Sequence, residues 1–73
     1  MASIDDKKFL ERLGERVRLR REARCLTQQQ LGELCGLHRT FIGSVERGER
    51  NISILNLRRL ATILRVKPAE LLL

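Results

Sequence analysis

Apolar residues recur along this 73-residue chain at the three- and four-residue spacing of amphipathic helices, and no stretch shows the alternation typical of a strand. Asp5 and Asp6 offer N-caps and favourable charge for a first helix that runs to about residue 24. The apolar stripe of this helix consists of Phe9, Leu10, Leu13 and Val17. The opening third of the chain is therefore predicted to be one long helix.

Capping and stop signals mark two short helices after it. Thr27 and Gln30 stand three residues apart in the form of a capping box, which predicts a second helix that ends at Gly36. A third helix opens at residue 38 or 39 and runs to about residue 47, where Gly48 stops it.

The same signals predict two more helices near the C-terminus. Ser53 caps a fourth helix over about residues 54–64, and Pro68 fits the first position of a last short helix. The apolar residues predicted to point inward from this part are Leu57, Leu60, Ala61, Leu64, Val66 and Leu71. We therefore expect an all-α, compact five-helix domain that spans residues 1–73.

The second and third helices have the spacing of a DNA-binding helix-turn-helix, over about residues 27–47. Counted from Gln28, the fifth residue is Gly32, and a very small residue there lets the two helix backbones approach. The ninth is Gly36, which adopts the left-handed conformation of the turn without steric cost. The residues expected to anchor both helices to the domain are Leu31, Leu34, Leu37, Ile42 and Val45.

The charge balance agrees with a polyanionic partner. Lys and Arg number 15 against 9 Asp and Glu, a net charge of +6, and 12 of the 15 are Arg. Arginine suits bidentate contact with phosphate or guanine. Charge alone would fit a solvated helical surface equally well, so the helix-turn-helix spacing decides for double-stranded DNA.

Several other classes of function are disfavoured by composition. Cys25, Cys35 and His38 are too few for a zinc site within one chain, and no apolar run approaches the roughly 20 residues of a membrane span. No nucleophile–base pair, carboxylate dyad or phosphate-binding glycine loop is present. We expect a cytoplasmic protein that is not an enzyme and uses no metal, cofactor or small-molecule ligand.

Three strings resemble the phage-repressor and Cro type of helix-turn-helix regulator, the XRE group, over about residues 13–72: LGERVRLRREARCLTQQQLGELCGL, IGSVERGERN and LRRLATILRVKPAELL. Within that group, residues 37–43 and 46–53 resemble the controller proteins of restriction–modification systems. The resemblance implies a sequence-specific transcriptional regulator that binds a pseudo-palindromic operator as a homodimer and regulates its own gene and that of the endonuclease. The alternative is another small XRE-type repressor, or an antitoxin-like or other protein-binding adaptor.

The candidate base-reading residues lie on and just after the third helix. Arg39 and Thr40 fall in its first turn, the end that points at base edges in the major groove. Arginine reads guanine O6 and N7, and the threonine methyl suits the thymine methyl. Ser44 lies one turn further on and could reach a base or a phosphate. By resemblance, Arg50 is the best candidate for a second base-proximal contact.

The candidate phosphate contacts surround that helix. Gln28 begins the second helix, where its amide and free backbone N–H groups can hold a phosphate. His38 is expected as a helix cap or a phosphate neighbour. Arg47 flanks the groove as a phosphate contact or a solvated charge, and the resemblance adds Asn51 and Ser53 as phosphate contacts.

The resemblance also has structural implications. Arg21 and Glu46 are expected to form an ion pair that fixes the first helix against the third. Related controllers carry Tyr where this chain has Phe41, which keeps the packing but loses the hydroxyl. Arg65 stands where a glycine commonly ends the fourth helix, which predicts an arginine in the left-handed conformation.

The C-terminal part, about residues 53–73, contains more apolar residues than one small core can use. The surplus, with Ile54 an alternative to Leu55, comprises Leu55, Ile63, Leu72 and Leu73. An exposed apolar patch on a small domain commonly marks an interface, so we predict a homodimer with recognition helices about 34 Å apart. Transcriptional activation would require a contact with RNA polymerase, for which Glu33 and Glu49 are exposed candidates.

Overall fold

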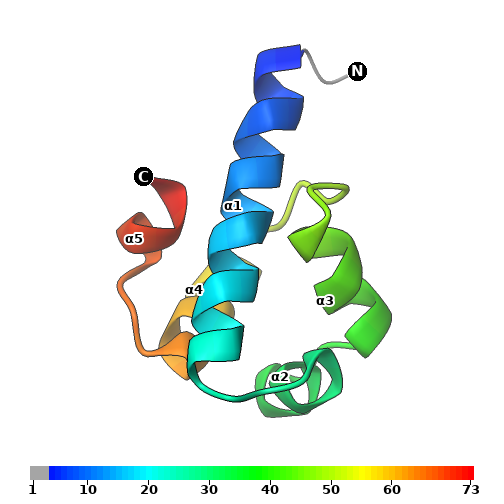
Figure 1. Ribbon diagram of the computed structural model, residues 1–73, viewed down its shortest axis with the longest axis vertical. Helices are drawn as coiled ribbons and strands as arrows, with labels where there is room; N and C mark the ends of the chain where they lie inside the picture. The colour runs from blue at the N-terminus through cyan, green and yellow to red at the C-terminus, as the bar shows by residue number, and fades with distance from the viewer. Residues whose placement is uncertain (1–3) are drawn as a thin grey trace.

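The computed structural model describes residues 4–73, which form five helices with no strand in that range (Figure 1). The elements are α1 (Ile4–Ala23), α2 (Gln28–Cys35), α3 (Arg39–Glu46), α4 (Ile54–Leu64) and α5 (Pro68–Leu72). The all-α, five-helix prediction is confirmed, and apart from the N-terminal end of α1 the predicted helix limits agree with the structure to within about one residue.

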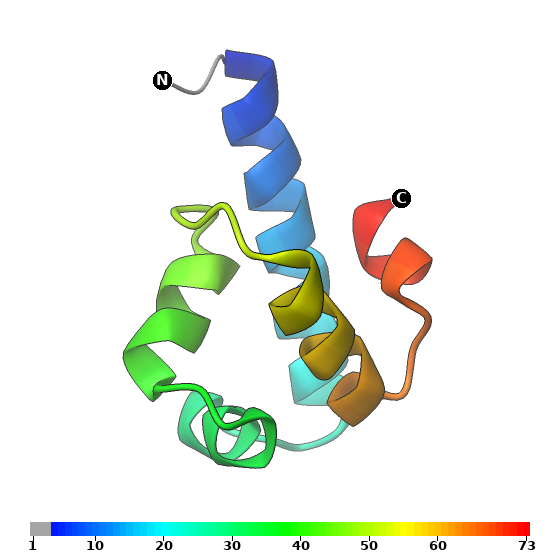
Figure 2. The ribbon, with the colours of Figure 1, turned by 180° about the vertical axis from the view of Figure 1, so that it is seen from behind.

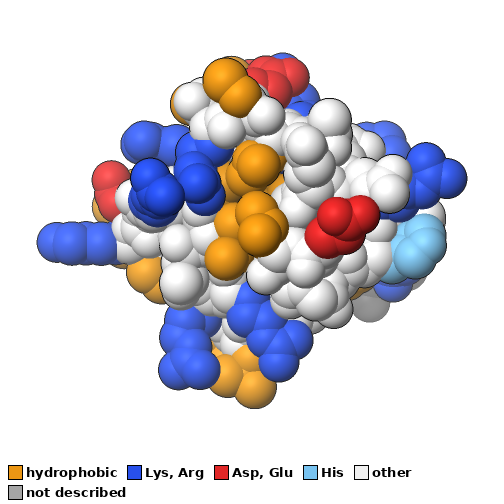
Figure 3. Space-filling model, turned by 90° about the horizontal axis from the view of Figure 1, so that it is seen from below, with side chains coloured by type: hydrophobic (Ala, Val, Ile, Leu, Met, Phe, Trp, Pro, Cys, Tyr) orange, Lys and Arg blue, Asp and Glu red, His pale blue; other side chains and the backbone are white. Residues whose placement is uncertain are grey.

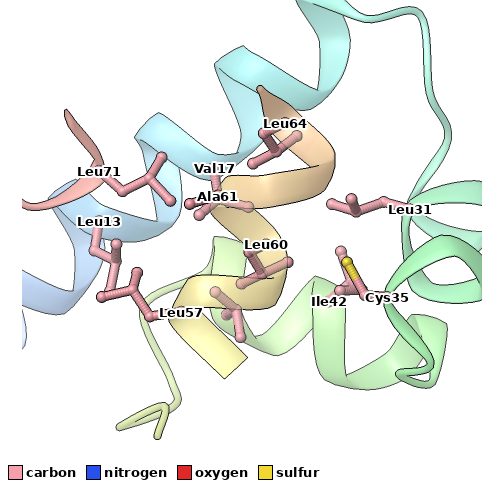
Figure 4. Close-up of a cluster of buried hydrophobic side chains, with 11 residues drawn as sticks. Leu13, Val17, Leu31, Cys35, Ile42, Leu57, Leu60, Ala61, Leu64 and Leu71 are labelled. Atoms are coloured by element: carbon pink, nitrogen blue, oxygen red, sulfur yellow. The ribbon is translucent and has the colours of Figure 1, made fainter. Parts of the chain in front are cut away.

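Helix α1 is the axis around which the other helices pack. Helices α3 and α4 lie along its lower half, α2 crosses beneath its C-terminal end, and α5 returns beside it (Figures 1 and 2). Side chains from all five helices meet in one apolar core (Figure 4). Its buried members are Leu13, Val17, Leu31, Cys35, Ile42, Val45, Leu57, Leu60, Ala61, Leu64 and Leu71. The predicted inward residues of the C-terminal part are all in this core except Val66, which packs against it half-buried.

The start of α1 differs from the sequence prediction. The helix already includes Ile4, so Asp5 and Asp6 lie in its first turn, where their charges favour the helix dipole, and are not its N-caps. Phe9 was expected in the core stripe but is 47% exposed. The reason is that the first turns of α1 extend beyond the other helices (Figure 1).

The prediction that Leu34 anchors α2 is wrong, because this side chain is 55% exposed. The inner face of α2 is taken by Leu31, Gly32 and Cys35. Leu34 instead borders a hollow between α2 and α4, together with Ile63 and two arginines of α4. The view onto the α2 end shows apolar side chains bordered by Lys and Arg (Figure 3).

Two helix C-caps adopt the left-handed conformation. Gly36 ends α2 with φ 71° and ψ 30°, and Arg65 ends α4 with φ 61° and ψ 41°. The first was predicted from the helix-turn-helix spacing and the second from the missing glycine. Both predictions are confirmed.

Candidate nucleic-acid interface

Local hydrogen bonds define both helices of the helix-turn-helix. The Thr27 hydroxyl accepts from the Gln30 backbone N–H at 3.0 Å, and the Gln30 side-chain oxygen accepts from the Thr27 N–H at 2.8 Å. This capping box starts α2. His38 caps α3, because its Nδ1 accepts from the Thr40 N–H at 3.0 Å. His38 was expected to be either a helix cap or a phosphate neighbour, and in the structure its ring caps the helix.

The two helices approach very closely at Gly32. A methyl group added at this position would overlap the backbone carbonyl oxygen of Leu37. The backbone cannot yield as a flexible side chain would, so the turn needs glycine for this contact. The close approach sets the angle at which α3 leaves α2 and presents its first turn to solvent.

A partly buried polar network joins α1, α2 and α3. Glu46 accepts two hydrogen bonds from Arg21, at 2.6 Å from Nε and 3.0 Å from Nη2. The side chains of Arg21 and Glu46 are only 11% and 3% exposed, respectively. Hydrogen bonding to Glu46 raises the pKa of the Arg21 guanidinium, although burial opposes this shift. The expected ion pair is thus present, and it fixes α1 against α3.

The same carboxylate also holds Gln28. The Gln28 side-chain nitrogen donates to Glu46 Oε1 at 3.0 Å, which links α2 to the network. Sequence reasoning had left the amide of Gln28 free for a phosphate. In the structure one of its N–H groups is already used within the protein, so its remaining donor capacity is smaller than expected.

The first turn of α3 offers the exposed polar groups that sequence reasoning assigned to DNA. Arg39 and Thr40 are both exposed. With Gln28, Gly43 and Arg47 they line a shallow polar hollow on the surface. The structure therefore brings two predicted base readers and two predicted phosphate contacts together on one surface.

Ser44 does not fit the base-reading role assigned to it. It is 6% exposed, and its hydroxyl donates to the Phe41 carbonyl oxygen at 2.7 Å and accepts from Arg50 Nε at 3.1 Å. This hydroxyl is buried, and its single proton is already donated inside the protein, so it cannot donate to a base. We therefore correct the prediction and remove Ser44 from the DNA-contacting set.

The predicted DNA contacts after α3 differ in how far their polar groups are already bonded within the protein. Arg47 forms an exposed ion pair with Glu49, at 3.1 Å between Nε and Oε2. Asn51 is exposed at the surface of the connector. The Ser53 hydroxyl accepts from the Asn56 N–H at 3.1 Å, so it caps α4. The N-cap role predicted for Ser53 is present, while its hydroxyl is less available for a phosphate.

The C-terminal part leaves apolar side chains uncovered, as the sequence predicted. Leu55 is 55%, Leu72 36% and Leu73 82% exposed. Ile54, the alternative to Leu55, is 74% exposed. Ile63 differs, because it is half-buried against the core.

Residues 4–73 show no group of three or more His, Cys, Asp or Glu side chains that could hold a metal ion. Within the same range, no helix is long and apolar enough to cross a membrane. Burial raises the pKa of the Cys35 thiol, as for a reduced cysteine packed in a core.

The family model described as Helix-turn-helix (HTH_3) matches residues 17–71. The chain belongs to this helix-turn-helix family. The match runs from the middle of α1 into α5, and so includes the polar network, the turn at Gly36 and the first turn of α3.

Named relatives place this helix-turn-helix protein more narrowly. It is 50% identical over 62 residues to the control protein C.SmaI of Serratia marcescens, covering 85% of this chain and 74% of that one. It is 40% identical over 60 residues to the control protein C.BamHI of Bacillus amyloliquefaciens, covering 81% of this chain and 74% of the relative. The crystal structure of the restriction-modification controller protein C.AhdI from Aeromonas hydrophila matches with 44% identity and a TM-score of 0.81, over 88% of this chain and 96% of that one. The protein is a helix-turn-helix transcriptional regulator.

Sequence reasoning missed two contacts of this helix-turn-helix protein. One is the hydrogen bond from Gln28 to Glu46, which has no local spacing signal because the residues are 18 positions apart. The other is the Arg50 guanidinium over the Phe41 ring, 5.5 Å from its centroid. An arginine and an aromatic residue near a predicted DNA-reading helix could have suggested the second contact, but not its geometry.

Proposed function

We propose that this protein is the controller of a restriction–modification system, a regulator that binds operator DNA in front of its own gene and the endonuclease gene. The observation that carries the proposal is its identity of 40–50% with two control proteins over nearly the whole helix-turn-helix domain. The match to the C.AhdI controller covers 96% of that chain, which supports the same role for a protein of this size. Because the DNA it would regulate lies in the cytoplasm, we assign it there, with no catalytic activity of its own.

The base-reading role falls to Arg39, Thr40 and Arg50. Arg39 and Thr40 project from the first turn of α3, so insertion of that turn into the major groove would bring both to base edges. Arg50 reaches the same helix from the following connector through its contacts with Ser44 and Phe41. Gln28, Arg47 and the exposed connector residue Asn51 flank these readers and would hold the phosphates on either side of the groove.

The active form in this proposal is a homodimer. The uncovered residues Leu55, Leu72 and Leu73 give the C-terminal part an apolar surface that a second copy would cover. A two-fold axis through this surface would place two α3 helices about one DNA turn apart, which requires a pseudo-palindromic operator. If the bound dimer activates transcription, the exposed side chains of Glu33 and Glu49 are the candidates for contact with RNA polymerase.

In vitro selection from a random duplex library tests the proposal directly. We expect the selected sequence to be an inverted repeat with half-site centres about one helical turn apart. We also expect the same repeat to lie upstream of the gene for this protein. Arg39→Ala should weaken binding to the selected operator by about 1–3 kcal/mol per half-site and relax the preference at one base pair. Selection of no consensus, or an Arg39→Ala variant with normal affinity and base preference, would refute the proposed docking.

A further inference from the structure

The Arg50 side chain is held at two points, although it lies on an exposed connector. Its Nε donates to the Ser44 hydroxyl at 3.1 Å, and its guanidinium carbon lies 5.5 Å from the centroid of the Phe41 ring. An arginine at a protein surface ordinarily samples many rotamers, and its ordering on binding lowers affinity. A hydrogen bond and a ring contact at the same guanidinium restrict that freedom before DNA arrives.

The direction of the hydrogen bonds fixes which part of the guanidinium is held. The single proton of the Ser44 hydroxyl goes to the Phe41 carbonyl, so its lone pairs remain for Arg50. The donor from Arg50 is Nε. Within residues 4–73 the two terminal nitrogens of Arg50 have no hydrogen-bond partner. Their N–H groups form the end of the fork that matches guanine O6 and N7.

Ser44 itself is unusual for its surroundings. It is buried at 6% exposure, and like the Glu46 side chain, at 3%, it is a polar group enclosed by the protein. A serine that bonds back to a carbonyl one turn earlier slightly destabilises a helix, and alanine would fill the same space. The stability of α3 therefore gives no reason for a hydroxyl at this position, whereas the contact with Arg50 does.

We propose that Ser44 and Phe41 are positioning residues that hold Arg50 by one edge and direct its terminal nitrogens at a guanine in the major groove. This inference rests on the proposed function, because it requires α3 to dock in that groove. Ser44 and Phe41 themselves contact no base. They set the specificity of the operator position that Arg50 reads.

Operator binding by a set of variants tests this inference. The probes are the selected operator, a series of it with each base pair substituted, and a scrambled duplex of equal length. Arg50→Ala should abolish the preference at one base pair per half-site, different from the one affected by Arg39→Ala. Ser44→Ala should weaken preference at the Arg50 base pair and lower operator affinity about two- to tenfold per half-site, the range expected when one long side chain must be ordered on binding. Binding to the scrambled duplex should not change.

A double-mutant cycle separates positioning from a general structural effect. In the Arg50→Ala background, Ser44→Ala should have no further effect on operator affinity, because the group it positions is gone. Phe41→Leu, which keeps an apolar side chain but removes the ring, should reproduce part of the Ser44→Ala loss at the same base pair. The matched control is Thr62→Ala, which removes a hydroxyl that donates to the Arg58 carbonyl at 2.8 Å on α4, and it should change neither base preference nor affinity.

The outcomes distinguish this inference from the proposed function. If Ser44→Ala weakens operator binding equally in the Arg50 and Arg50→Ala backgrounds, Ser44 supports the fold and the inference is overturned. The same holds if Ser44→Ala leaves base preference unchanged while Arg39→Ala relaxes it. If neither arginine substitution changes base preference, the proposed function fails as a whole. Thermal melting of each variant separates loss of folding from loss of reading.

Discussion

The helix-turn-helix and the C-terminal part of this small domain are stabilised in different ways. Helices α2 and α3 are held by a close backbone contact at Gly32 and by the polar network around Glu46. Helices α2 and α3 also contribute four of the eleven core residues. Helices α4 and α5 contribute five and are held mainly by this apolar packing. The C-terminal part leaves Ile54, Leu55, Leu72 and Leu73 exposed, whereas α2 and α3 leave Leu34 as their one exposed large apolar side chain.

This difference follows from what each region has to do. A reading helix must keep one orientation, and directional hydrogen bonds together with steric contact fix orientation better than apolar packing does. An interface must instead offer apolar area that becomes buried only in the assembly. We call α2 and α3, with the polar network around Glu46, the directional region, and α4 and α5 the apolar region. Their contrast agrees with one part that reads DNA and another that joins two copies.

Removal of the Glu46 carboxylate should have the largest effect, because the directional region depends on it. Glu46→Ala removes the buried carboxylate from the Arg21 guanidinium, whose side chain is 11% exposed, and leaves it only the Leu26 carbonyl at 2.8 Å and Glu22 at 4.0 Å. Breaking one side of a buried pair costs about 3–5 kcal/mol. We expect the free energy of unfolding, measured by urea denaturation at fixed protein concentration, to fall by that amount and operator binding to fall with it.

The control for Glu46→Ala is the neighbouring ion pair at the surface. Arg47 and Glu49 lie 3.1 Å apart with side chains 58% and 57% exposed, so Glu49→Ala should change stability by less than about 0.5 kcal/mol. Equal effects from the two substitutions would mean that the Glu46 network does not hold α1 and α3 together.

Changes to the apolar region should affect assembly and leave the fold intact. Leu72→Ser combined with Leu73→Ser should shift the protein toward monomer, because both side chains are exposed in the single chain. The dimer gives the second reading helix a high effective concentration, and its loss should lower operator affinity about hundredfold. Sedimentation velocity over micromolar concentrations measures the first effect, and binding to operator and scrambled duplexes measures the second.

Leu34 provides a matched control from the other region. It is an exposed leucine, at 55%, but it lies on α2 and not on α4 or α5, which carry Leu55 and Leu72. Leu34→Ser should leave both the sedimentation coefficient and the operator affinity unchanged. A Leu72→Ser, Leu73→Ser variant that remained dimeric, or a monomer with full operator affinity, would remove the proposed interface.

The difference between the two regions also explains what the sequence could predict. Apolar periodicity and capping residues predicted all five helices, because these signals act within a few residues of one another. The spacing of Gly32 and Gly36 predicted the turn for the same reason. The sequence did not predict that Leu34 faces solvent, because three neighbouring residues of α2 compete for one inner face and tertiary packing decides among them. Nor could it predict that Ser44 is buried beneath Arg50, since that depends on where the connector after α3 returns.

The smallest effects concern the helix ends, where each region uses a different residue for the same conformation. Gly36 ends α2 and Arg65 ends α4, and both are left-handed, at φ 71° and 61°. A non-glycine residue in this conformation lowers the free energy of unfolding by about 1–2 kcal/mol through backbone strain. A glycine lowers it by about 0.4–1 kcal/mol, because glycine makes the unfolded chain more flexible. Arg65→Gly should therefore stabilise the protein by up to about 1 kcal/mol. A methyl group added at Gly36 would meet no heavy atom within 4 Å beyond its chain neighbours, so Gly36→Ala tests backbone strain alone and should destabilise by about the same amount. For a domain of this size each change corresponds to a shift in Tm of about 4–8 °C, in opposite directions for the two variants. If Arg65→Gly lowered Tm instead, contacts of the Arg65 side chain would outweigh the backbone strain, and the C-terminal part would not rest on apolar packing alone.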